Sequence, residues 1–208
     1  MTGQDRQALR RQFGELALDI VRRRGIEVTL AVLASEAGVS LARMDAIFES
    51  DDDLFDAVTE IWYAPLIAIM EDVLASELPA NRKLYEFFAR RFAHTRAIYR
   101  EDPAYFRLLC ELGGRRFEQV RSYVDLADHY TCEIIAEAQA EGYFEGLSID
   151  RALTLINQMV IAYTMPDMLT MIDERLSEEK LAAIIDTLFA GLSARDGGAK
   201  GVAGLRAA

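Results

Sequence analysis

The chain has 208 residues, of which 51% are hydrophobic and 27% are charged, a composition that supports a compact core and excludes an intrinsically disordered protein. Its 23 lysines and arginines stand against 34 aspartates and glutamates, so the formal net charge of −11 argues against a surface coated with nucleic acid, which requires cations. Two cysteines cannot build a disulfide framework, and no apolar run is long enough for a secretory signal or a membrane span, so we expect a cytoplasmic protein without a membrane partner.

Apolar side chains at helical spacing predict three helices within the first 48 residues. The first ends before Gly25, a residue type that stops helices. Thr29 is expected to cap the second helix with its side-chain oxygen, and Ser40 the third. Between these two helices the chain reverses at Gly38, where a positive φ angle is expected and Val39 fills the gap between the helices. Short helices joined by such a tight turn are typical of a helix-turn-helix.

The rest of the chain also follows helical periodicity, with few prolines and no pattern of alternating strands. Ser50 and Asp53 form a capping-box pattern that opens a long helix ending near Leu78. Further helices are expected near residues 81–100, 103–113, 115–142, 149–172 and 177–193. The sequence therefore predicts an all-α protein of about nine helices, with a helix-turn-helix head in residues 1–50, a second helical domain in residues 51–194 and a glycine-rich, disordered tail in residues 195–208.

The N-terminal pattern resembles the TetR/AcrR family of bacterial transcriptional regulators. The residues that carry the resemblance lie within residues 9–62 in the family's order and spacing: Gly25, Thr29, Leu33, Ala34, Ala37, Gly38, Val39, Ser40, Phe48, Ser50, Leu54 and Phe55. The resemblance implies a DNA-binding head followed by a domain for effector binding and dimerisation. It also implies that an effector moves the fourth helix and thereby changes the spacing of the two heads in a dimer.

The third helix is expected to enter the major groove of DNA, braced by the second. The candidate DNA contacts are the outward residues of this helix, the two capping residues and two arginines near the N-terminus: Thr29, Ser40, Leu41, Ala42, Arg43, Asp45, Ala46, Arg6 and Arg10. Arg43 is the one cation of the third helix, so we expect it to contact a base or a phosphate. The alternative is an exposed arginine without such a role.

Two positions depart from the family's usual pattern. The family usually has an aromatic residue in place of Asp45 and a lysine in place of Asp51, and both contact the DNA backbone. Glu49 and residues 51–53 make this corner acidic, which also suits the positive end of a helix dipole. Residues 1–63 hold seven arginines and twelve acidic residues, a net charge of −5, so the sequence predicts weak attraction for phosphate unless the arginines gather on the DNA side.

The C-terminal half has many large aromatic and methionine side chains, most of which are expected to belong to an ordinary core. Buried tyrosines seek hydrogen-bond partners, so several together predict an apolar cavity with polar wall groups, suited to an apolar or aromatic effector. The candidate effector contacts are Trp62, Phe88, Phe92, Phe106, Cys110, Tyr123 and Tyr163.

The segment 149–165 is apolar on more than one side, so we expect it to bury one side against a second subunit. Together with the helix near 177–193 it would form a four-helix, two-fold interface in a homodimer, which suits a palindromic operator. The alternative is packing within one chain. The candidate interface residues are Ile156, Val160, Ile185, Leu188 and Phe189.

No residue pattern indicates catalysis, a cofactor or a metal site, since His94 and His129 are far apart and no phosphate-loop or nucleophile motif occurs. We therefore expect a repressor without enzymatic activity or a cofactor that binds palindromic double-stranded DNA and is released by a small-molecule effector. One alternative is a module of the same fold that binds a small molecule or a protein, with DNA binding weakened or lost because of the acidic region 45–53. The other is an enzyme on this scaffold, for which the sequence offers no acid–base pair.

Overall fold

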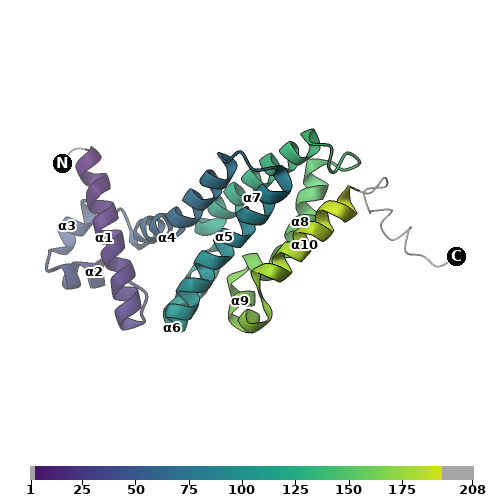
Figure 1. The fold of residues 1–208 in the computed structure, drawn as a ribbon. Helices are drawn as coiled ribbons and strands as arrows, with labels where there is room; N and C mark the ends of the chain where they lie inside the picture. The colour runs from purple at the N-terminus through teal and green to yellow at the C-terminus, as the bar shows by residue number, and fades with distance from the viewer. Residues whose placement is uncertain (1–2, 194–208) are drawn as a thin grey trace. The chain divides into compact units, whose positions relative to one another are not determined.

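The computed structural model describes residues 3–193, and the predicted disordered tail lies outside these residues. Within this range ten α-helices and the 3₁₀ helix η1 follow one another without a strand, which confirms the all-α class (Figure 1). None of these helices combines the length and the apolar character that crossing a membrane requires. In chain order the helices are α1 (Gly3–Arg24), α2 (Leu30–Ala37), α3 (Leu41–Asp45), α4 (Asp51–Leu74), α5 (Ala80–Glu101), α6 (Pro103–Arg115), α7 (Phe117–Ala140), α8 (Ile149–Thr164), α9 (Pro166–Ile172), η1 (Asp173–Arg175) and α10 (Glu178–Leu192).

The helices form two compact units. Unit 1 comprises residues 3–67 and 101–122. It therefore holds α1–α3 and α6 completely, most of α4 and the start of α7. Unit 2 comprises residues 68–100 and 123–193, and holds nearly all of α5, most of α7 and α8–α10. The functional boundary at residue 50 stays a prediction, because α4 and α7 each continue from one unit into the other.

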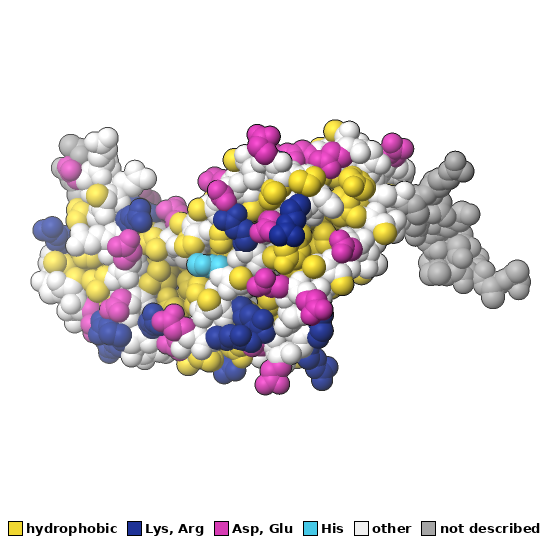
Figure 2. Space-filling view, in the orientation of Figure 1, with side chains coloured by type: hydrophobic (Ala, Val, Ile, Leu, Met, Phe, Trp, Pro, Cys, Tyr) yellow, Lys and Arg dark blue, Asp and Glu magenta, His cyan; other side chains and the backbone are white. Residues whose placement is uncertain are grey.

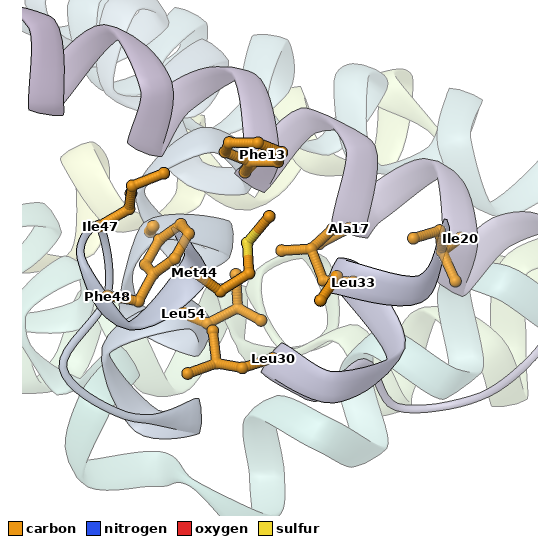
Figure 3. Packing of buried hydrophobic residues seen from close by; sticks show 11 residues of the cluster. Phe13, Ala17, Ile20, Leu30, Leu33, Met44, Ile47, Phe48 and Leu54 are labelled. Carbon is orange, nitrogen blue, oxygen red and sulfur yellow. The ribbon is translucent and has the colours of Figure 1, made fainter. Parts of the chain in front are cut away.

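We call residues 3–63 the head, and its first three helices enclose one hydrophobic cluster (Figure 3). Phe13 and Ala17 of α1, Leu33 of α2 and Met44 of α3 are buried together in this cluster. Val39, in the turn, is partly buried against the cluster, as predicted. Because α2 and α3 each bury one side here, their opposite sides face solvent.

Glycines end the first two helices, as predicted. Gly25 and Gly38 have φ angles of 64° and 65°, in the left-handed region that favours glycine. The N–H of Gly38 donates to Ser35 O (3.3 Å) and that of Val39 to Ala34 O (3.0 Å), which closes α2 and reverses the chain. No atom lies within 4 Å of a Cβ built on Gly38, so the backbone angle and not crowding requires glycine.

Two of the later helix predictions are wrong. The fourth helix ends at Leu74 and not near Leu78, and the Ser76 hydroxyl donates to Val73 O (2.6 Å) just beyond its end. The helix predicted over residues 149–172 is two helices, because Pro166 has no N–H to continue α8 and keeps Met165 extended, with φ −89° and ψ 119°. The other predicted helices agree with the structure within a few residues.

Ion pairs fix the helices of unit 2 around its core. Lys83 of α5 is buried, donates to Leu74 O (3.0 Å) and lies 2.8 Å from a carboxylate oxygen of Glu137 on α7. Arg96 of α5 pairs with Asp173 of η1 at 2.6 Å. Helices α8 and α10 pack side by side (Figure 1). These contacts position the helices that carry most of the predicted effector and dimer residues.

Candidate nucleic-acid interface and effector site

Helix α3 turns one side to the core and the other to solvent. Met44 is buried in the hydrophobic cluster of the head. The five residues predicted as contacts on this helix all lie on its exposed side: Leu41, Ala42, Arg43, Asp45 and Ala46. Leu41 is 48% exposed, unusual for a leucine, so this surface offers an apolar group to a partner.

Two backbone N–H groups in the first turn of α2 have partners within the protein. Thr29 Oγ1 accepts the N–H of Val32 (3.3 Å), which confirms the predicted cap. The Asp51 carboxylate accepts the N–H of Leu30 (2.7 Å), so it ties the start of α4 to α2. Backbone N–H groups at the start of a helix can bind an anion such as a phosphate, and Asp51 occupies one of them, the N–H of Leu30. Nothing in the sequence spacing indicated the bond, since 21 residues separate its two partners.

The predicted cap by Ser40 is wrong. Ser40 occupies the capping position of α3 with extended backbone angles, φ −73° and ψ 150°, but its hydroxyl makes no capping hydrogen bond. Its carbonyl oxygen accepts the N–H of Arg43 (3.0 Å). The role of Ser40 as a phosphate contact stays a prediction.

Arg6 and Arg10, predicted as DNA contacts, have partners inside the head. Arg10 Nη1 lies 2.7 Å from Asp53 Oδ2, and Arg10 Nη2 lies 2.7 Å from Asp53 Oδ1. The guanidinium carbon lies 5.1 Å from the centre of the Phe48 ring. Arg6 Nε donates to Ile47 O (3.0 Å), with Glu49 3.7 Å from its guanidinium. A contact with DNA would therefore have to replace these bonds.

Asp53 is the centre of this arrangement. Besides Arg10 it accepts the N–H of Glu49 (2.8 Å), while its own N–H donates to Ser50 Oγ (3.1 Å). The predicted capping box is therefore confirmed in its Ser50 half, but the return bond reaches Glu49 and not Ser50. The hydrogen bond from Arg10 lowers the pKa of the Asp53 carboxyl below its ordinary value of 3.8, against the opposing effect of partial burial.

Four further arginines of the head also have carboxylate partners. The pairs are Arg11 with Glu15 (3.1 Å), Arg22 with Glu101 (2.6 Å), Arg23 with Asp19 (2.7 Å) and Arg24 with Glu36 (2.8 Å). Arg43 forms no ion pair with any residue between 3 and 193. Figure 2 shows basic and acidic side chains interspersed on the face that it displays.

The seven predicted effector residues fall into two groups, one in each unit. In unit 1 the rings of Trp62 and Phe106 lie 6.4 Å apart, and the partly buried Cys110 follows on the same helix as Phe106. An open groove along α1 and α4 of this unit contains none of the seven residues. In unit 2 Phe92 meets Tyr163 edge to face at 5.0 Å. Their role in effector binding stays a prediction.

Tyr123, another predicted effector residue, marks a cation that sequence reasoning missed. Arg91 of α5 donates to Tyr123 Oη from both Nε (3.2 Å) and Nη2 (3.0 Å) and lies over the Phe87 ring at 5.0 Å. The side chain is partly buried, yet no carboxylate pairs with it in the described part of the chain. Phe88, by contrast, is buried against Phe87 at 5.4 Å.

The five residues predicted at the dimer interface lie in the interior of the chain, which corrects the prediction. Ile156, Val160, Ile185, Leu188 and Phe189 are all buried within a single chain, so these side chains are not exposed to a second subunit. Phe189, for example, packs against the rings of Tyr143 (5.0 Å) and Phe144 (4.7 Å). The predicted apolar periodicity is present, but the five residues chosen from it are buried within the chain. Large apolar groups that remain exposed on α8 are Met159 (48%) and Ile161 (49%).

Comparisons with known proteins place the chain among regulators. Residues 80–185, about half of the chain, match the family described as the tetracyclin repressor-like C-terminal domain. No curated protein matches the chain. A transcriptional regulator of the TetR/AcrR family from Thermobifida fusca superposes with a TM-score of 0.60 at 18% identity, over 88% of this chain and 98% of that one.

Two regulators from Bacillus have the same fold. The fatty acid degradation regulator FadR from Bacillus halodurans superposes with a TM-score of 0.61 at 17% identity, covering 88% of this chain and 95% of that one. The transcriptional regulator FadR from Bacillus subtilis, solved in complex with stearoyl-CoA, superposes with a TM-score of 0.59 at 18% identity, covering 86% and 97%. At these identities the likeness is one of fold.

The Asp53 pair predicts an acid-sensitive contribution to stability. Because the folded pKa of Asp53 is lowered, its contribution is complete above the unfolded value near 3.8 and is lost as the pH falls through the lower folded value. Asp53→Asn is expected to reduce the free energy of unfolding by about 1 kcal/mol at pH 7, and the difference from wild type should shrink below about pH 4. Urea unfolding at pH 7 and pH 3 measures it.

The matched control is Asp45→Asn, which removes the same charge from an exposed residue of the head. It is expected to change the free energy of unfolding by less than about 0.5 kcal/mol at either pH. A difference between Asp53→Asn and wild type that does not vary between the two pH values would contradict the assignment.

Proposed function

The chain belongs to the TetR/AcrR family of transcriptional regulators, and from this premise we propose that it is a ligand-responsive repressor that binds palindromic operator DNA as a dimer. Members of this family regulate transcription and are not enzymes, which agrees with the sequence interpretation. The observation that carries the proposal is the helix-turn-helix of α2 and α3. Its exposed side holds Leu41, Ala42, Arg43 and Ala46 on a helix that α2 and the head cluster brace from behind. A protein of this kind acts in the cytoplasm.

The dimer surface is proposed on the exposed sides of α8. Met159 and Ile161 supply the apolar groups that the buried residues of this helix cannot, and Met165 follows them at 48% exposure. A two-fold dimer suits the operator, because each head meets one half-site of a palindrome.

The effector is proposed to be a small apolar or aromatic molecule with an acidic group. The aromatic side chains of unit 2 support the apolar part. Arg91 supports the acidic group. Its partly buried guanidinium donates to Tyr123 Oη and has no carboxylate partner among residues 3–193, so it gains a counter-ion from an anionic ligand. Of the two Bacillus proteins with the same fold, one is a fatty acid degradation regulator and the other was solved with stearoyl-CoA, which supports an effector with an apolar chain and an acidic group.

A second candidate function is favoured by the bond between Asp51 and Leu30. A carboxylate at the amide end of α2 and a head with a net charge of −5 both oppose phosphate binding. Under this alternative the protein is an effector- or protein-binding module of the same fold with weak or no DNA binding.

Selection from a pool of random duplexes separates the two functions. The repressor is expected to enrich a sequence with two-fold symmetry at low salt, where phosphate attraction is strongest. Failure to enrich any such sequence at 50 mM KCl would contradict the repressor function and leave the alternative.

The effector proposal is tested with the enriched duplex bound to the protein. Decanoate is expected to release the duplex, whereas decanol, which has no charge, is not.

The dimer surface is tested by Met159→Asp and Ile161→Asp. Each places a charge in the proposed contact, so the protein is expected to elute as a monomer, with its mass measured by light scattering. Val124→Asp makes the same change at an apolar residue of α7 that is 40% exposed, and this variant should stay a dimer. Variants of α8 that remain dimeric would exclude this surface.

A further inference from the structure

Among residues 3–193, the pairing of the head arginines leaves Arg43 as the one head arginine without a carboxylate partner. Of the seven arginines in residues 1–63, Arg43 alone has no carboxylate partner among residues 3–193. Exposed ion pairs, such as that of Arg11 with its 78% exposed side chain, are weak and can open. The partner carboxylate stays beside the opened arginine, however, so the net attraction for a phosphate is small.

The bonds at the start of α4 have the same consequence. Asp51 occupies the N–H of Leu30, and the bidentate pair with Asp53 holds Arg10 against the ring of Phe48. Neither the N–H of Leu30 nor Arg10 is therefore offered to the DNA backbone without breaking a bond. Phosphate contacts position a protein on DNA but carry no sequence information. A head in which these contacts are weak depends more on contacts with bases.

The surroundings of Arg43 suit a base edge. It lies on the exposed side of α3, which also carries Leu41, Ala42 and Ala46. Guanine presents O6 and N7 in the major groove, and the planar fork of an arginine can donate to both. Apolar side chains beside an arginine can contact the methyl group of thymine.

We propose that Arg43 binds a guanine in each half-site of the operator and is the main specificity-determining residue of the head. This inference rests on the DNA-binding function proposed above. The exposed apolar residues of α3 then favour thymines next to that guanine. The ligand is duplex DNA with a G·C pair at the position facing Arg43 and A·T pairs beside it.

The experiment uses the full chain and the duplex obtained by selection. In each half-site the proposed guanine is replaced by 7-deazaguanine, which keeps the Watson–Crick pair but lacks the N7 acceptor. Wild type is expected to bind this duplex at least about fivefold more weakly than the unmodified one. Arg43→Ala is expected to lose at least about tenfold on the unmodified duplex and to show no further loss on the modified one.

The control is Arg11→Ala, which removes the same charge from an exposed arginine of α1. It is expected to bind the unmodified duplex within about threefold of wild type and to lose affinity on the modified duplex as wild type does. Equal losses for Arg43→Ala and Arg11→Ala would show a role for charge alone and would overturn the inference. A further loss for Arg43→Ala on the modified duplex would also overturn it.

The failure of the inference and that of the proposed function are distinguishable. If selection enriches no sequence, the repressor and the inference fall together. If a palindrome is enriched and bound but lacks a common guanine, only the inference falls. Because Arg43 is exposed, its replacement should leave the thermal unfolding curve unchanged, and circular dichroism checks this before binding is measured.

Discussion

The organisation of the head depends on the bonds that Asp53 makes. One carboxylate accepts the N–H of Glu49 and two nitrogens of Arg10, so it joins the loop after α3 and the start of α4 to α1. Asp51, two residues earlier, ties the same end of α4 to α2. Because α4 continues into unit 2, these two carboxylates connect the helix that leaves the head with all the elements that support α3.

The acidic residues that build the head also neutralise its cations. The pair of Arg10 with Asp53 joins α1 to α4, and that of Arg6 with Glu49 joins α1 to the preceding loop. Both pairs remove an arginine from the set that could attract phosphate. In a head with a net charge of −5, the proposed recognition of DNA depends on α3 and its exposed Arg43. The sequence left open whether the arginines gather on a basic side that faces DNA. Because the structure pairs them with carboxylates, two alternatives remain. Either the head binds DNA mainly through bases, or it has lost DNA binding.

Local signals in the sequence predicted most of the fold. Gly25 and Gly38 could be predicted as helix ends because glycine is the residue type that readily adopts a positive φ angle. The cap by Thr29 could be predicted because its bond to Val32 spans only three residues. Pro166 is an equally local signal, and weighing it would have divided the helix predicted over 149–172. Ser40 shows the limit of such signals, since it has the capping backbone angles without the side-chain bond.

The site was less predictable, because its contacts link distant residues. Arg10 and Asp53 are 43 residues apart, and Arg91 and Tyr123 are 32 apart, so no spacing rule identifies these partners. Periodicity showed that α8 is apolar on more than one side but not which side faces α10. The structure shows that Ile156 and Val160 are buried and that Met159 and Ile161 are exposed.

We propose that a head whose arginines are neutralised binds DNA through bases and gains little affinity from phosphates. The most direct measurement is the affinity of wild type for its selected duplex between 50 and 300 mM KCl. Each phosphate contact contributes about −0.9 to the slope of log K against log salt, so the account predicts a slope between about −1 and −3 for the dimer. A slope of about −5 or steeper, as six or more phosphate contacts would give, would contradict it.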